Sequence, residues 1–214
     1  MAKTTAPLLG FGASGQIAKT QVYSTWKGRL YARKHVIPAN PQTANQTKTR
    51  TAFTWLMAVW KLSATEWQDV WNAYAQGQVM TGRNAMGKFN VSPLRSATDL
   101  STLVFSPGAK GGLAPLSIAV APSASTLTVT LGAPTLPTGW TIAKAIAVAI
   151  QDQDPQTDAF YNSFVADDAS APYAPAITGL VTGTLYRVGA YFQYTKPDGT
   201  TAYGTALTGT GTPT

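Results

Sequence analysis

The chain has 214 residues, a formal net charge of +7 and only 12% charged residues, against about 25% in an average globular domain. This length corresponds to one large domain or two small ones, and 44% hydrophobic residues supply enough material for a core. Cysteine is absent and His35 is the single histidine, which excludes disulfides, thiol catalysis, cysteine-ligated metals and, within one chain, a serine triad or multi-histidine metal centre.

No segment has the pattern of a secretory leader or a membrane span. The start of the chain lacks a continuous apolar region. The longest apolar run, Ile142 to Ile150, has nine positions and contains Lys144, whereas a spanning helix needs about 20 residues. We therefore expect a soluble, non-enzymatic protein that has no cofactor, metal or membrane partner.

The two halves of the chain carry opposite charge. Residues 1–110 hold 13 Lys/Arg and three acids, whereas residues 111–214 hold three Lys/Arg and six Asp. Five of the six Trp lie in the first half, and Ser106 to Gly112 has the composition of a linker. This pattern predicts a basic docking domain over residues 1–107, a Gly-rich linker over 108–112 and a β-sandwich over 113–214.

Gly10 to Gly15 matches the G-x-G-x-x-G pattern of dinucleotide-binding sites. Only nine residues precede it, the chain after it favours a strand, and positions 30 to 40 contain no acid. The context therefore argues against a nucleotide site, and we expect a flexible arm whose glycines allow close backbone contacts.

Residues 21–36 predict a β-hairpin, with strands on both sides of a turn at Lys27-Gly28. Because side chains alternate along a strand, one face carries Arg29, Tyr31, Arg33 and His35, and the other carries Leu30, Ala32, Lys34 and Val36. A cationic face with an aromatic ring suits phosphates or a carboxylate-rich protein surface; the alternative is a solvated face without a partner. The candidate partner-binding residues are Trp26, Lys27, Arg29, Tyr31, Arg33 and Lys34.

Two helices follow. Asn40-Pro41 predicts a helix start, with the helix running to about Leu62, and Ser63 to Glu66 predicts a capping box for a second helix that ends at Gly77. We expect these helices to form an antiparallel pair whose aromatic stripe is either core or a surface for another subunit. A short third helix is expected from about Arg83 to Phe89, followed by extended chain after Pro93.

A set of aromatic, basic, Gly, Pro and amide residues occurs in a characteristic order through the first half. They are Trp26-Lys27-Gly28, Tyr31, Arg33, Val36, Pro38, Asn40, Pro41, Thr43, Gln46, Arg50, Trp60, Leu62, Trp67, Trp71, Gly82, Asn84 and, offset, Phe89. This arrangement, which covers roughly residues 10–95, resembles a family of small proteins encoded among phage and prophage structural genes. The resemblance implies a virion-associated structural protein of the head, neck or tail.

About seven short strands separated by turn residues are expected in the second half, which is the pattern of a sandwich. They are placed at Leu116–Ala121, Thr126–Leu131, Trp140–Ile150, Ala159–Val165, Tyr173–Ile177, Leu185–Tyr194 and Thr201–Leu207.

The segment Leu180 to Tyr186 is similar to the L-x-P-G-T-x-Y segment of fibronectin type III domains, with Thr182 in place of Pro. The likeness implies that the Tyr186 hydroxyl bonds to the upstream backbone and that Trp140 is the inward aromatic near the start of a central strand.

Asp152, Asp154 and Asp158 have the spacing of the start of a calcium loop, but the Gly and the terminal Glu of an EF-hand are missing. We therefore expect a solvated strand connection there, and likewise at Asp167-Asp168.

The sequence thus predicts an α+β chain of two domains: a β-hairpin with a helical hairpin, and a C-terminal immunoglobulin- or fibronectin III-like sandwich. The function that the resemblance implies is that of a bacteriophage virion structural protein, capsid-associated as a decoration, cement or head–neck accessory protein and assembled in the host cytoplasm. Its expected partners are capsid, portal or tail proteins and copies of itself, with attachment through residues 1–107 and a possible host-surface glycan on the sandwich. The alternatives are a nucleic-acid-binding module, although nucleic acid is not the expected main ligand, and a tail-associated carbohydrate-binding adhesin.

Overall fold

The computed structural model describes residues 3–4, 13–37, 39–40, 42–108, 113–160 and 162–214. Contacts between residues divide the chain into two compact units, Met1–Gln42 and Thr43–Thr214. We call them the hairpin unit and the main unit and describe each by itself.

The hairpin unit is an antiparallel sheet of four strands in chain order: β1 (Lys3–Thr4), β2 (Ala13–Ile17), β3 (Gln21–Trp26) and β4 (Arg29–Lys34). The predicted hairpin is confirmed. Lys27 and Gly28 connect β3 to β4 with φ angles of 47° and 77°. Two consecutive positive φ angles are typical of the type I′ turn, whose twist matches that of paired strands.

The main unit begins with α1 (Ala44–Leu62), which is capped by Thr43 rather than by Asn40. The Thr43 hydroxyl accepts a hydrogen bond from the Gln46 amide at 3.4 Å, satisfying one of the free amides of the first turn. The helix start predicted at Asn40-Pro41 is therefore wrong by one helical turn, and Pro41 itself lies outside the described residues.

The second helix, α2 (Thr65–Ala75), follows without the predicted capping box. Its N-cap residue is Ala64, and no side chain bonds to the first turn. The Ser63 hydroxyl instead donates to the Trp60 carbonyl at 3.1 Å, which ends α1. The same serine therefore closes the preceding helix rather than opening the next one.

The third helix, α3 (Gly82–Leu94), extends past the predicted end at Phe89 and takes Pro93 into its last turn. It packs against both α1 and α2, which make few direct contacts with each other. The predicted direct pairing of the first two helices is thus replaced by a group in which α3 is the common neighbour.

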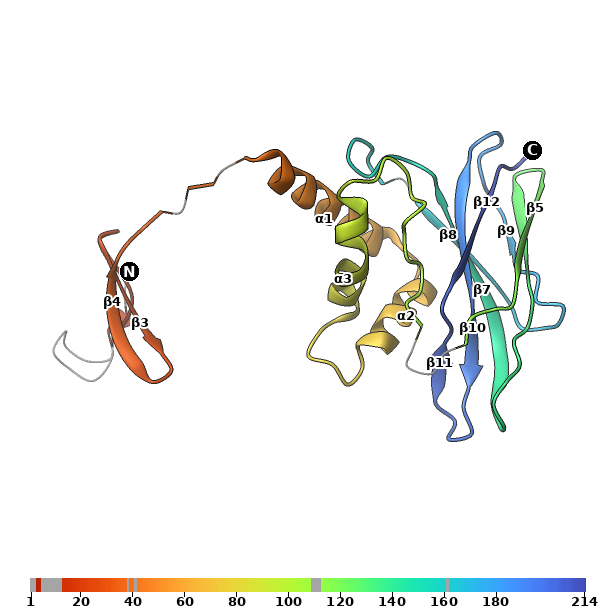
Figure 1. Cartoon of the computed structure of the whole chain (residues 1–214), viewed down its shortest axis with the longest axis horizontal. Helices are drawn as coiled ribbons and strands as arrows, with labels where there is room; N and C mark the ends of the chain where they lie inside the picture. The colour runs from red at the N-terminus through yellow and green to blue at the C-terminus, as the bar shows by residue number, and fades with distance from the viewer. Residues whose placement is uncertain (1–2, 5–12, 38, 41, 109–112, 161) are drawn as a thin grey trace. The chain divides into compact units, whose positions relative to one another are not determined.

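Two antiparallel sheets form the rest of the main unit. The smaller has the order β5-β6-β9; the larger has the order β11-β10-β7-β8, with β12 on the same edge of β10 as β11. Figure 1 shows the helices on one side of the larger sheet and β5 and β9 on the other. The strands are β5 (Ile118–Ser123), β6 (Thr126–Leu131), β7 (Thr141–Gln151), β8 (Ser163–Asp168), β9 (Ala176–Ile177), β10 (Tyr186–Thr195), β11 (Thr201–Tyr203) and β12 (Leu207–Gly211).

The central strand β7 is buried on both faces. Its larger side chains, Ile146, Val148 and Ile150, pack into one cluster with the helices. Its alanines, at 145, 147 and 149, pack into a second cluster between the two sheets. The α+β class with a sandwich-like arrangement of sheets is therefore confirmed, but the domain boundary predicted at residues 108–112 is not, because the helices and the larger sheet share a core.

The tryptophans of the helices belong to that shared core. Trp55, Trp67 and Trp71 are 4%, 1% and 1% exposed. The Trp67 indole stacks on Phe105 at 5.7 Å between ring centroids and donates its N–H to the Phe105 carbonyl at 2.8 Å. Of the two interpretations of the aromatic stripe, core is confirmed.

Two details expected of the sandwich are present. The Tyr186 hydroxyl accepts a hydrogen bond from the Val181 amide at 3.0 Å, which confirms the predicted bond to the upstream backbone. Trp140 is half-buried just before β7, and its ring lies edge-on to Tyr194 at 6.0 Å. Tyr186 belongs to the cluster between the sheets, and Trp140 packs against that cluster.

A fragment of residues 113–214 should be far less stable than one of residues 43–214. Without the helices, the face of the larger sheet that carries Ile146, Val148 and Ile150 meets water, at a cost of about 1.5–3 kcal/mol for each large apolar side chain. Urea unfolding of both fragments, followed by circular dichroism, measures the difference. Equal unfolding midpoints would show that the sheet does not depend on the helices.

The variant Tyr186→Phe should lose about 1–2 kcal/mol of unfolding free energy, because the Val181 amide loses its acceptor at a partly buried position. The matched control is Tyr173→Phe, since the Tyr173 hydroxyl makes no hydrogen bond within the described residues. The same urea titration compares the two, and a loss as large in the control would contradict this role for Tyr186.

Candidate binding surfaces

The hairpin register brings four of the predicted partner-binding residues onto one face. Trp26 lies opposite Arg29, and Tyr31 and Arg33 follow at alternate positions along β4. Residues directly opposite in an antiparallel pair share a face, as do alternate residues along one strand. We call Trp26, Arg29, Tyr31 and Arg33 the Trp-Arg face.

The Trp-Arg face is open to solvent. Trp26 is 65% exposed and Tyr31 is 41% exposed, and both arginines are exposed. The Lys27 ammonium lies 4.9 Å from the centre of the Trp26 ring and adds a fifth cationic or aromatic group at the hairpin turn. Large exposed aromatic rings beside arginine are enriched where proteins bind partners.

Lys34 lies on the opposite face of β4, where it pairs with Gln21. The Tyr23 hydroxyl on that face donates to the Gln21 side chain at 2.9 Å. His35, just beyond β4, is half-buried, and its amide donates to the Thr20 carbonyl at 2.7 Å. The structure therefore separates Lys34 from the other predicted partner-binding residues.

The charge of the hairpin unit cannot be neutralised from within. Residues 1–42 contain six Lys/Arg and no Asp or Glu, whereas residues 43–214 contain ten Lys/Arg and nine acids. Any salt bridge to the Trp-Arg face must therefore come from the main unit or from another molecule.

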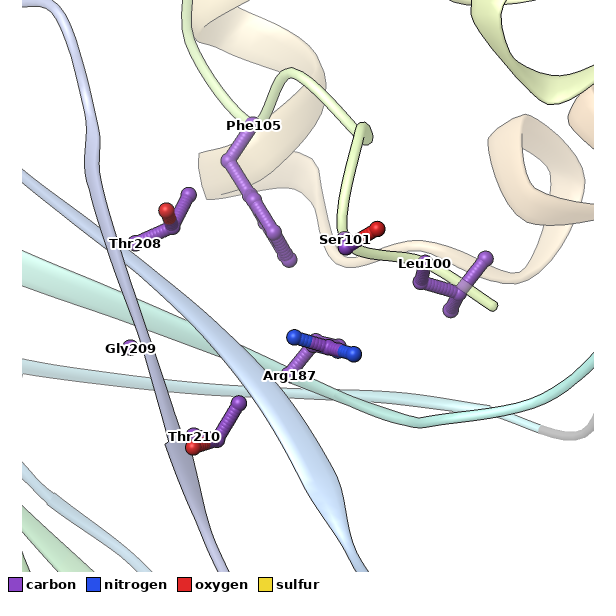
Figure 2. Close-up of a pocket in the computed structure, with 7 residues that line it drawn as sticks. All are labelled: Leu100, Ser101, Phe105, Arg187, Thr208, Gly209 and Thr210. Carbon is purple, nitrogen blue, oxygen red and sulfur yellow. The ribbon is translucent and has the colours of Figure 1, made fainter. Parts of the chain in front are cut away.

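In the main unit, a cavity of about 170 Å³ surrounds the guanidinium of Arg187 on β10. Figure 2 shows this side chain between the loop that carries Leu100 and Phe105 and the strand that carries Thr208, Gly209 and Thr210. The guanidinium pairs with Asp152 at 3.1 Å and with Asp99 at 3.4 Å. Because two carboxylates already share the cation, the cavity is not a site for an anionic ligand.

The Arg187 group instead holds the loop after α3 against the sheet. Asp152 also accepts a hydrogen bond from the Leu100 amide at 2.9 Å, so one carboxylate joins the loop and the arginine. Hydrogen bonds from the hydroxyl and amide of Ser101, together with the Arg187 charge, lower the pKa of Asp99 and keep it ionised.

The aspartates with calcium-loop spacing do not converge. Asp152 turns to Arg187, whereas Asp154 accepts from the Gln156 amide at 2.7 Å and Asp158 accepts from the Asp154 amide at 2.9 Å. They stabilise the connection between β7 and β8, and the described residues contain no cluster of three potential metal ligands. Asp167 pairs with Lys144 at 2.9 Å, and Asp168 accepts from the Ser170 and Ala174 amides.

Two further expectations bear on binding. Of the G-x-G-x-x-G segment, only residues 13–15 are described; Ala13 and Gly15 lie in β2, and Gly15 has a φ of 110°. Within the described ranges, no helix has the length and apolar character that crossing a bilayer requires.

No family model and no curated protein matches this chain. Among solved structures, a computer-based redesign of a β-sandwich protein is similar at 19% identity and a TM-score of 0.33, covering 46% of this chain and 87% of its own. A myokine structure is similar at 16% identity and a TM-score of 0.35, covering 48% of this chain and 99% of its own. At these TM-scores the similarities carry no argument about function.

The variant Arg187→Met should lose about 3 kcal/mol of unfolding free energy, because it leaves Asp152 and Asp99 side by side without their cation. The control Lys144→Met, which removes a more exposed ion pair with Asp167, should cost at most about 1 kcal/mol. Urea unfolding at neutral pH measures both. Equal losses would contradict a holding role for Arg187.

Proposed function

We propose that the chain is a structural protein of a bacteriophage virion that associates with the capsid, as a decoration, cement or head–neck accessory protein. It docks through its basic N-terminal part after assembly in the host cytoplasm. The family assignment is supported by the likeness of residues 10–95, in which Trp26-Lys27-Gly28, Tyr31 and Arg33 occur together with the segment around Asn40.

The observation that carries the docking proposal is the positive charge of the hairpin unit, displayed on an exposed face of paired strands. The unit has six Lys/Arg and no acid, and two of them, Arg29 and Arg33, lie beside the exposed Trp26 and Tyr31 rings on one face of the paired strands. Such a face suits a partner rich in carboxylates or phosphates. Capsid, portal and tail proteins are the proposed partners. Trp, Tyr and Arg are the residue types that most often dominate the binding energy of a protein interface.

The sandwich of the main unit is proposed to be of the fibronectin type III kind and to project or make lateral contacts. Support comes from the three-stranded and larger sheets and from the hydrogen bond between Tyr186 and the backbone at Val181. The outer face of the smaller sheet, which carries Ala119, Ala121, Thr128 and Thr130, has no charge, as broad contact with copies of the chain requires.

Single-stranded nucleic acid is a second candidate partner. Three of the four helix tryptophans are buried and cannot stack on bases, and the fourth, Trp60, is half-buried. Trp26 and Tyr31, in contrast, are exposed on the same strand face as Arg29 and Arg33. Aromatic rings and cations on one sheet face are what a stacking platform for single strands uses.

The double variant Arg29→Glu, Arg33→Glu should bind at least about tenfold more weakly to particles assembled without the protein, because it reverses the charge of the Trp-Arg face. Lys34→Glu on the opposite face is the matched control for Arg33→Glu. If the face docks, Arg33→Glu weakens binding more than Lys34→Glu does, and the wild-type affinity falls with added salt. Co-sedimentation with particles at several salt concentrations measures this.

Unchanged binding by the double variant would overturn docking through this face. Equal losses from Arg33→Glu and Lys34→Glu would indicate unspecific attraction instead of a docked face. Sub-micromolar binding of an oligothymidine at about physiological salt, lost in Trp26→Ala and Tyr31→Ala, would favour the nucleic-acid candidate.

A further inference from the structure

A polar groove runs between α2 and β11 in the main unit. Two cavities, of about 420 and 760 Å³, adjoin there and share Ala73, Gln76, Thr200 and Thr201 as lining residues. Cavities of this size are typical of small-molecule sites. The groove lies within the main unit, away from the Arg187 cavity, and has no part in the docking proposal.

One wall of the groove is a single face of α2. Asp69, Asn72 and Gln76 follow one another at spacings of three and four residues, so their side chains line up along the helix. All three are exposed, and within the described residues none of these side chains has a hydrogen-bond or ion-pair partner. The Asn72 oxygen packs against Gly82 of α3, but the polar groups of this wall make no hydrogen bond to other described residues.

Asp69 differs in this respect from the other carboxylates. Glu66 occupies the first turn of α2, where the helix dipole favours negative charge. The remaining seven form ion pairs or accept backbone hydrogen bonds in turns: Asp99, Asp152, Asp154, Asp158, Asp167, Asp168 and Asp198. Among the residues that the structure describes, Asp69 alone has no partner or helix position of this kind.

The opposite wall is built by β11 and the turn before it. Thr201 and Tyr203 line the first cavity, and Lys196 lines the second. Burial and the nearby Asp69 charge raise the pKa of Tyr203, so its phenol stays protonated and can donate. Hydroxyls, amides, one carboxylate and one ammonium thus face each other across the groove.

We infer that this groove binds a neutral oligosaccharide. Vicinal sugar hydroxyls donate and accept at once, and Asn72, Gln76 and Thr201 offer both kinds of partner. The negative charge of the Asp69 carboxylate would repel a polyanionic ligand. A peptide ligand needs pockets for its side chains, whereas the apolar part of this lining consists of Ala73, Pro107 and the rings of Tyr74 and Tyr203, against which a sugar ring can also pack. Cleavage is not expected, because glycoside hydrolysis uses two carboxylates and the lining holds one.

The full-length, ¹⁵N-labelled protein is titrated with cellohexaose, chitohexaose and mannohexaose, with the peptide Gly-Gly-Ser-Gly-Gly-Ser and a heparin hexasaccharide for comparison. We expect at least one neutral sugar to bind and to shift the side-chain amides of Asn72 and Gln76. The variant Asn72→Ala, Gln76→Ala should weaken that binding at least about tenfold, equivalent to about 1.4 kcal/mol. The control Asn45→Ala, Gln46→Ala removes the same residue types from the exposed start of α1 and should bind like the wild type.

Failure of all three neutral sugars to shift these amides at millimolar concentration overturns the inference. So does binding that survives in the groove variant, or binding of only the peptide or the heparin fragment. Particle attachment is measured separately on the same variants, so that loss of sugar binding with intact attachment separates the groove from the Trp-Arg face.

Discussion

The main unit depends on a sheet that is covered on both faces. Along β7, branched side chains at 146, 148 and 150 alternate with alanines at 145, 147 and 149, so the two faces differ in the space they leave. The branched face is filled by helices that carry large tryptophans, whereas the alanine face lets the smaller sheet approach closely. Neither cover can be removed without exposing a row of apolar side chains, and this is why the helices belong to the sandwich in energetic terms.

The covered sheet also explains the unusual residues of β10. Arg187 and Gly189 lie on the helix-facing side, where a continuous apolar surface would be expected. A Cβ on Gly189 would lie 2.1 Å from the ring of Phe105, so glycine is required for that ring to reach the sheet. Arg187 takes up the carboxylates of Asp99 and Asp152, and Ser106 donates to the Gly204 carbonyl at 2.6 Å. The chain after α3 is thus fitted between helices and sheet by specific contacts.

Features set by local rules could be predicted from the sequence. The turn at Lys27-Gly28 and the strand Thr126–Leu131 match the structure because turn residues and alternation act over a few positions. Helix ends were less predictable, because Asn40 and Ser63 both have the right chemistry for an N-cap. In the structure Thr43 takes the N-cap position of α1, and Ser63 closes α1 instead of opening α2. The shared core was missed, because the charge difference between the halves describes surfaces, whereas contacts between β7 and the helices join residues about eighty positions apart.

The two candidate surfaces also differed in how far the sequence could predict them, because one depends on local alternation and the other on contacts between distant elements. Alternation along a strand identifies the Trp-Arg face without knowledge of the rest of the fold. The groove between α2 and β11 needs two elements about 130 positions apart, and its residues match no spacing motif. The groove is recognised only in the structure, where seven carboxylates have partners, Glu66 lies in the first turn of α2, and Asp69 has neither among the described residues. In the main unit, Lys144 and Arg187 pair with acids, whereas residues 1–42 contain six Lys/Arg and no acid. No ion pair within the hairpin unit can therefore reduce the charge of the Trp-Arg face. The ion pairs that hold the main unit together thus use other charges than those proposed for docking.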